Sequence, residues 1–122
     1  RVDAPLFNAI AAAAIAGIGH FEPQNLSNLA WAFAKLAVQS VPLMYVIASR
    51  AQSMIGNFDR QGLSNMAWAF ATLSLVDAPL FEAIAAASIR AISAMTPQHV
   101  ANIAWSFAKL GLTDKPLLAA LS

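Results

Sequence analysis

The chain has 122 residues, of which 59% are hydrophobic and 11% are charged, and seven Lys and Arg against six Asp and Glu give a formal net charge of +1. This composition excludes a disordered segment, and the lack of cysteine excludes a disulfide framework and a thiolate metal site. The longest run without a polar or charged side chain is residues 9–19, eleven residues, and a membrane span needs about 18 to 20. No membrane span is therefore predicted.

The sequence repeats with a period of 37 residues. Tryptophans recur at this spacing, as Trp31, Trp68 and Trp105. Cutting before the prolines that share the period divides the chain into units 5–41, 42–78 and 79–115, with a partial fourth unit at 116–122. Twelve of the 37 columns are identical in all three full units. We therefore expect one repeat array over 1–122, and interpret it as a fragment of a longer array.

Each unit is predicted to contain two helices. The first begins at a proline that follows a capping residue two positions earlier, namely Asp3, Ser40, Asp77 and, in the partial unit, Asp114. The second begins near 23, 60 and 97, where Asp59 and Thr96 are good N-caps and Glu22 is a poorer one. The small residues Ala37, Ser74 and Gly111 mark where the second helices should end.

The predicted fold is all-α, an α-solenoid of stacked helix-turn-helix pairs. Apolar residues at helical spacing form the stripe Leu6, Ile10 and Ala14 in the first helix and the stripe Leu26, Leu29, Phe33 and Leu36 in the second. A single helix pair cannot bury such stripes, whereas stacked pairs can. A small-residue flank beside the second stripe, formed by Ser27, Ala30 and Ala34, should let neighbouring helices approach closely.

Segments 21–36 and 58–73 share the string Leu-Ser-Asn-x-Ala-Trp-Ala-Phe-Ala, and segment 95–110 is a looser copy in which Ala101 and Ser106 replace Ser and Ala. The array resembles the heptatricopeptide and octotricopeptide helical-repeat family, and the 37-residue period favours the first name. This resemblance implies an organellar protein, of the chloroplast or the mitochondrion, that binds RNA and supports its processing, stability, translation or ribosome assembly.

The candidate RNA-binding residues lie opposite the apolar stripe of the second helix. Amides can hydrogen-bond the base edges of unpaired RNA, and lysines can contact phosphates. Stacking of the units would align three columns: Gln24, Gln61 and Gln98; Asn28, Asn65 and Asn102; Lys35, Thr72 and Lys109. A structural alternative stays open, in which Asn hydrogen-bonds the backbone of the neighbouring repeat, Gln satisfies a helix end and the lysines are only solvated.

Other conspicuous residues are interpreted as structural. The tryptophans could stack on bases, but packing between repeats is the favoured interpretation, and Phe7, Phe21, Phe58 and Phe81 are expected in the core or between helices. Arg50 and Arg90 are expected on the outer face, in solvent by default. His20 and His99 share no repeat column, and the acidic residues are explained by helix starts. No enzyme activity, cofactor, metal site or small-molecule substrate is therefore expected.

Two functions remain. The first is binding of single-stranded organellar RNA along the concave face by the three polar columns. The net charge of +1 supplies little phosphate neutralisation for this role. The alternative is a protein scaffold or accessory subunit within a large organellar complex, such as a ribosome or a photosynthetic assembly. The high alanine content, 28 residues, and the low charge fit this alternative slightly better, whereas the family resemblance favours RNA.

Overall fold

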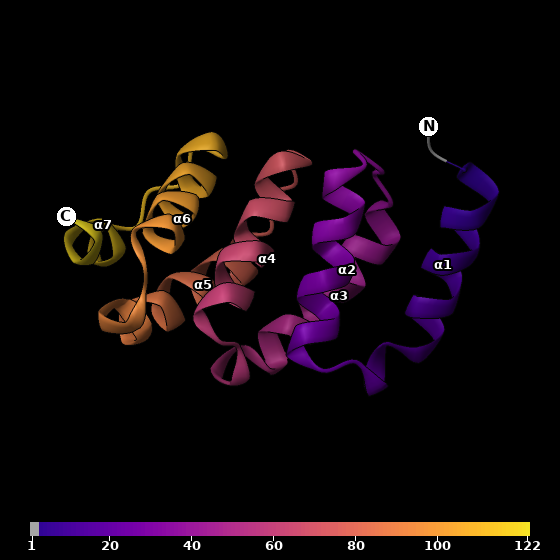
Figure 1. Cartoon of the computed structure of the whole chain (residues 1–122), viewed down its shortest axis with the longest axis horizontal. Coiled ribbons are helices and arrows are strands. Elements are labelled where there is room, and N and C mark those ends of the chain that lie inside the picture. Colours follow the sequence, from indigo (N-terminus) through magenta and orange to yellow (C-terminus); the bar gives the residue numbers. More distant parts are fainter. Residues whose placement is uncertain (1–2) are drawn as a thin grey trace.

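The computed structural model describes residues 3–122, and within this range the chain forms helices and turns without a strand. Figure 1 shows the helices following one another along the long axis, from α1 near the N-terminus to α7 at the opposite end. The all-α prediction is confirmed, and the stacked pairs give an α-solenoid. The α-helices are α1 (Ala4–Gly17), α2 (Pro23–Lys35), α3 (Val41–Ser53), α4 (Arg60–Thr72), α5 (Ala78–Ala91), α6 (Pro97–Lys109) and α7 (Lys115–Leu121).

Local chemistry sets where the helices begin. Asp3, Asp77 and Asp114 each accept a hydrogen bond from the backbone N–H three residues later, at 2.9 to 3.0 Å. These bonds satisfy N–H groups that have no partner within the helix. Ser40 occupies the same position before α3 but makes no such bond. All four predicted residues therefore occupy the N-cap position, and the three aspartates also make the capping hydrogen bond.

The second helices begin and end at equivalent positions. Short 3₁₀ turns, Ile18–His20, Ile55–Asn57 and Ile92–Ala94, join the two helices of each pair. Asp59 and Thr96 cap α4 and α6 through their side chains. Each second helix then stops at a residue with positive φ: 56° for Ala37, 57° for Ser74 and 68° for Gly111. The following N–H returns to a carbonyl five residues back, as in Val38 N–H to Phe33 O at 2.8 Å, which is a Schellman motif.

The helices form two rows with different spacing. The inner row consists of α2, α4 and α6, which lie in close contact, whereas α1, α3, α5 and α7 form an outer row with far fewer contacts between successive helices. Large aromatic side chains separate the rows, with Phe7 packed edge-on against Phe33 and Phe81 against Phe107. Because the inner helices are closer together than the outer ones, the stack curves towards the inner row, which lines the concave side.

Small side chains explain the close approach within the inner row. Ser27, Ala30 and Ala34 of α2, which form the predicted small-residue flank, are buried. The Ser27 hydroxyl lies 3.4 Å from the Gly62 carbonyl of α4, and a Cβ added to Gly62 would lie 3.1 Å from that hydroxyl. The two helices thus approach tightly at a residue without a side chain.

Two predicted stripes are only partly buried. Leu6 of α1 and Leu36 of α2 are about half exposed, although the equivalent residues Leu80 and Leu73 are buried. The reason is position in the stack, because α1 and α2 have a neighbour of their own row on one side only. The aromatic prediction is confirmed: Phe58 and Phe81 are buried, and Phe7 and Phe21 pack against the core while partly exposed.

Candidate nucleic-acid interface

The predicted polar columns become three rows across the inner helices. Because α2 lies against α4 and α4 against α6, side chains at the same repeat position follow one another along the concave side. Six of the nine are exposed and three are half-buried. The exposed members are Gln24, Gln61, Gln98, Asn28, Lys35 and Lys109, and the half-buried ones are Asn65, Asn102 and Thr72. Thr72 differs from the lysines of its row, since its hydroxyl oxygen is buried.

A fourth row consists of the three tryptophans. Gln24, Asn28, Trp31 and Lys35 follow i, i+4, i+7 and i+11, so the indole belongs to the same exposed stripe of α2. Trp31 and Trp105 are 42% and 45% exposed, and Trp68 is half-buried. We define the inner groove face as these four rows of Gln, Asn, Trp and Lys or Thr.

The favoured interpretation of the tryptophans as packing residues is only partly correct. The rings of Trp31 and Trp68 do meet across the repeat boundary, with centroids 6.4 Å apart and planes inclined by 35°. The Lys35 ammonium also lies 5.8 Å from the Trp31 ring. However, the exposure of Trp31 and Trp105 leaves much of each indole open to solvent. The spacing of the exposed stripe was the signal that could have placed them on the surface.

Hydrogen bonds within the groove face test the structural alternative. Gln61 donates to the Asn65 side-chain oxygen at 2.8 Å, and Gln98 donates to that of Asn102 at 3.0 Å. Within residues 3–122, none of the three Asn side chains of this row bonds the backbone of a neighbouring repeat. The Asn row is therefore not an inter-repeat ladder of backbone hydrogen bonds.

Other side chains connect the repeats instead. Arg50 of α3 donates to the carbonyls of Phe21 and Gly19 at 3.1 to 3.3 Å, Gln39 donates to Leu73 O, and Arg60 donates to Ala94 O. Arg50 was expected in solvent, and this expectation is wrong because its guanidinium binds the turn of the preceding repeat.

His99 has a structural position at the start of α6. Its side chain is 6% exposed, Nδ1 lies 3.2 Å from the Thr96 backbone nitrogen, and Nε2 lies 3.0 Å from Oε1 of Gln61 in the preceding inner helix. His20 is exposed in the turn after α1. Over the part of the chain described, no three His, Cys, Asp or Glu side chains are grouped as metal ligands would be.

A polar cleft opens beside the groove face where α2 and α4 begin. It has a volume of about 340 Å³, and Gln24, Asn28, Gln61 and Asn65 line it together with the carboxylates Glu22 and Asp59. The cleft is therefore continuous with the Gln and Asn rows. Its volume is within the range of small-ligand pockets, about 300–1,000 Å³.

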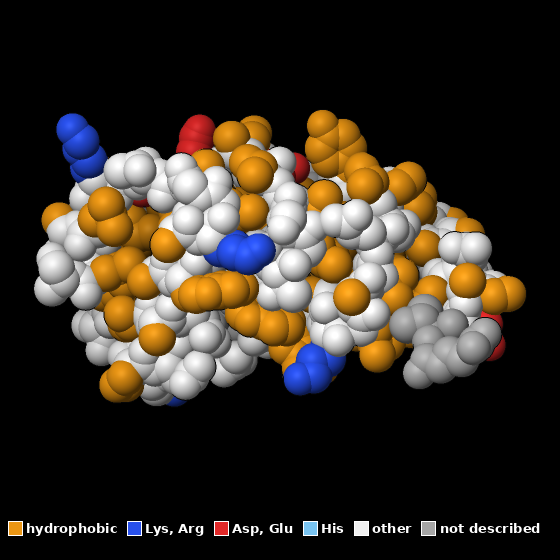
Figure 2. Space-filling view, turned by 90° about the horizontal axis from the view of Figure 1, so that it is seen from above, with side chains coloured by type: hydrophobic (Ala, Val, Ile, Leu, Met, Phe, Trp, Pro, Cys, Tyr) orange, Lys and Arg blue, Asp and Glu red, His pale blue; other side chains and the backbone are white. Residues whose placement is uncertain are grey.

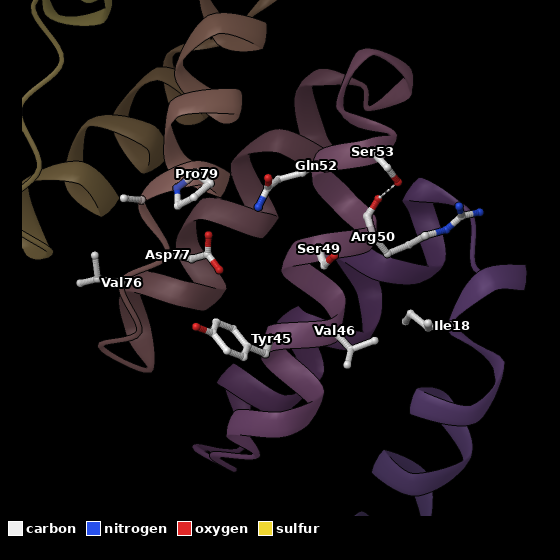
Figure 3. A pocket seen from close by; sticks show the side chains of 11 residues that line it. Ile18, Tyr45, Val46, Ser49, Arg50, Gln52, Ser53, Val76, Asp77 and Pro79 are labelled. Carbon is white, nitrogen blue, oxygen red and sulfur yellow. Dashed lines mark hydrogen bonds between the residues drawn. The ribbon is translucent and has the colours of Figure 1, made fainter.

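A second hollow lies on the other side of the array. Figure 3 shows that it is bordered by Tyr45, Ser49 and Arg50 of α3, by Ile18 and by the start of α5 at Asp77 and Pro79. We call it the outer groove, and its volume is about 720 Å³. Tyr45 and Val76 at its rim are 70% and 58% exposed. Its surroundings are thus more apolar than those of the inner cleft.

Charge is sparse over the surface. On the face that Figure 2 shows, Lys, Arg, Asp and Glu side chains stand apart from one another among apolar and neutral groups. The inner groove face carries two cations, Lys35 and Lys109. This face therefore offers more amide and indole groups, which suit contact with bases, than cations, which suit contact with phosphates.

These features define a class: an α-solenoid whose concave side presents ordered rows of amide and indole side chains. The chain belongs to the family described as RESC6, RNA-editing substrate-binding complex 6 protein, which matches residues 3–122. No curated protein matches the sequence. The family description makes the chain an RNA-related helical protein, and the predicted resemblance is correct at this level. The description does not assign the chain to the heptatricopeptide or octotricopeptide family. No helix between residues 3 and 122 has the length and apolarity to cross a bilayer.

Proposed function

We propose that the chain binds single-stranded RNA along the inner groove face, as a non-catalytic subunit of an RNA-editing substrate-binding complex. The observation that carries this proposal is the alignment of exposed indoles with the Gln and Asn rows on one face of three successive helices. Membership of the RESC6 family supports it, because the family description names such a complex.

Each row has a distinct task in this proposal. Indoles provide stacking surfaces for unpaired bases, and such stacking contributes about 1–3 kcal/mol per base. Amides of the Gln and Asn rows hydrogen-bond base edges. Lys35 and Lys109 contact phosphates at the far end of the stripe. The predicted residues thereby act together with three tryptophans that sequence reasoning had assigned to packing.

The finer parts of the proposal follow the resemblance described above. We infer that the 37-residue units are repeats of the heptatricopeptide type and that the protein acts in an organelle, the chloroplast or the mitochondrion. Its contribution there is to RNA processing, stability, translation or ribosome assembly. Because the net charge is only +1, stacking provides most of the affinity, and further RNA-binding subunits of the complex supply phosphate contacts.

Intrinsic fluorescence tests this function directly, because all three tryptophans of the chain belong to the groove face. Titration with single-stranded oligonucleotides should quench the emission, and equimolar duplex RNA should quench it far less. The combined Asn28→Ala and Asn65→Ala variant should weaken binding while the circular dichroism spectrum stays helical. Tyr45→Ala, on the outer groove, is the matched control and should bind RNA normally. If no single-stranded RNA changes the emission or mobility of the chain, RNA binding by this face is refuted.

A protein scaffold is the second candidate, and the outer groove favours it. Exposed apolar side chains that gather around a groove mark interaction surfaces, and Tyr45 and Val76 are examples here. In this role the outer row docks another subunit of the same complex. Recovery of a defined partner after nuclease digestion, lost on Tyr45→Ser but kept in the Asn28 and Asn65 variant, would support the scaffold role. Loss of every partner on digestion would contradict it.

A further inference from the structure

The cleft between the starts of α2 and α4 depends on Gly62. The equivalent column holds Asn25 in α2 and His99 in α6. Gly62 is buried against Ser27 and Phe58 and has no side chain to extend into the cleft. Between α4 and α6, by contrast, the His99 imidazole is buried and reaches Gln61. The α2–α4 and α4–α6 boundaries therefore differ in chemistry, although the same Gln and Asn rows cross both of them.

His99 also determines how the Gln61 amide is oriented. The Thr96 backbone N–H can only donate, so His99 Nδ1, 3.2 Å away, is the acceptor. In a neutral imidazole the proton is then on Nε2, which donates to Gln61 Oε1 at 3.0 Å. This bond fixes the oxygen of the Gln61 amide towards α6 and its nitrogen away from it.

The orientation of the Gln61 amide in turn fixes the orientation of the Asn65 amide. The Gln61 nitrogen donates to Asn65 Oδ1 at 2.8 Å. Among residues 3–122, Asn65 Nδ2 donates to no protein group, while Asn65 lines the cleft. A chain of three hydrogen bonds thus presents Asn65 to the cleft as a donor.

The charged groups of the cleft can only accept hydrogen bonds, whereas its other amides, those of Gln24, Asn28 and Asn57, can both donate and accept. Glu22 and Asp59 contribute carboxylates, and no Lys or Arg lines the cleft. A phosphate would be repelled by these carboxylates, whereas a neutral base would not. Uracil and guanine carry a carbonyl next to an imino N–H, which match the Asn65 donor and a carboxylate acceptor. Cytosine and adenine carry an amino group and an unprotonated ring nitrogen in those places, so they reverse the pattern.

We propose that this cleft binds one base of the RNA strand and favours the keto bases uracil and guanine over cytosine and adenine. The inference rests on the proposed function, since the strand must first lie along the inner groove face. His99 is a positioning residue in it, because it acts through Gln61 and Asn65, and Gln61, which also lines the cleft, determines which atom of the Asn65 amide faces the base.

The test compares the affinity of the full chain for short oligonucleotides of uridine and of cytidine, and of inosine and of adenosine, by tryptophan quenching. The uridine and inosine strands should bind about five- to tenfold more tightly, the ratio expected from one hydrogen bond. Gln61→Glu keeps an acceptor for His99 but has no N–H for Asn65, so Asn65 should turn and the preference should invert. His99→Phe should abolish the preference without inverting it.

Gln98→Glu is the matched control, because it adds the same charge to the equivalent Gln–Asn pair of α6, away from the cleft. It should lower all affinities alike and keep the uridine preference. Equal binding of uridine and cytidine strands by the unmodified chain, or the same preference in Gln61→Glu, would overturn the inference while leaving RNA binding intact. Absence of binding to all four strands would refute the proposed function itself.

Discussion

Replacing Trp105 by alanine removes an indole whose surface is 45% exposed at the α6 end of the inner groove face. Trp31 and Trp68 contact each other, with centroids 6.4 Å apart, whereas Trp105 is not part of that aromatic pair. Removal of Trp31 would uncover more of Trp68, which could then stack on a base in its place. Trp105 therefore gives the cleaner measurement of what one indole contributes.

The magnitude follows from the chemistry of stacking. One base stacked on an aromatic side chain contributes about 1–3 kcal/mol. Because roughly half of the Trp105 surface is covered by its own helix and neighbours, a loss of about 1–2 kcal/mol is expected. This corresponds to an increase of about 5- to 30-fold in Kd. Trp31→Ala should cost less, and the pair Trp31→Ala with Trp68→Ala should cost more than the sum of the two single changes.

The assay is electrophoretic mobility or fluorescence anisotropy with a labelled single-stranded oligonucleotide, because both remain usable when a tryptophan is removed. Thermal unfolding followed by circular dichroism provides the control, and a nearly half-exposed side chain should affect the midpoint little. Unchanged affinity in Trp105→Ala and in the double variant, with the helical spectrum intact, would refute the role of the indoles as stacking surfaces. The scaffold candidate would then be preferred.

Three further predictions concern charge and backbone. With two lysines on the groove face, the slope of log K against log salt should be about −1.4, and Lys35→Ala should reduce it to about −0.7, measured by titration at several salt concentrations. A slope unaffected by Lys35→Ala would place the phosphates elsewhere. Ser74→Gly should raise the free energy of unfolding by about 0.5–1 kcal/mol in urea titrations, because φ is 57° at Ser74, and an unchanged midpoint would contradict this. Gly62→Ala should be less stable than Gly17→Ala by about 1 kcal/mol or more in urea titrations, because the new Cβ would lie 3.1 Å from Ser27 Oγ and from Phe58 Cδ2, whereas nothing lies within 4 Å of a Cβ at Gly17. Equal stability of the two variants would show that the neighbours of Gly62 adjust without cost.

The helices and the pattern of the inner surface follow from interactions between residues close together in the chain. The start of α5 after Asp77 follows from a capping hydrogen bond, and the end of α6 before Gly111 follows from a dihedral preference. Both effects act within a few residues of the chain. The small flank at Ala30 indicated close packing because side-chain volume limits how near two helices can lie. Because the same local pattern recurs in each repeat, the polar rows could be predicted from the sequence.

The contacts between one repeat and the next depend on how the helices pack in three dimensions. The contact of Trp31 with Trp68, the bonds from Arg50 to the preceding turn and the bond between His99 and Gln61 join residues about 30 to 40 positions apart. Repeat periodicity aligns the units but does not specify which side chain reaches across a boundary, because that depends on how far the helices stand apart and how they turn. The cleft beside Gly62 has the same origin, since a missing side chain matters only where another helix packs against it.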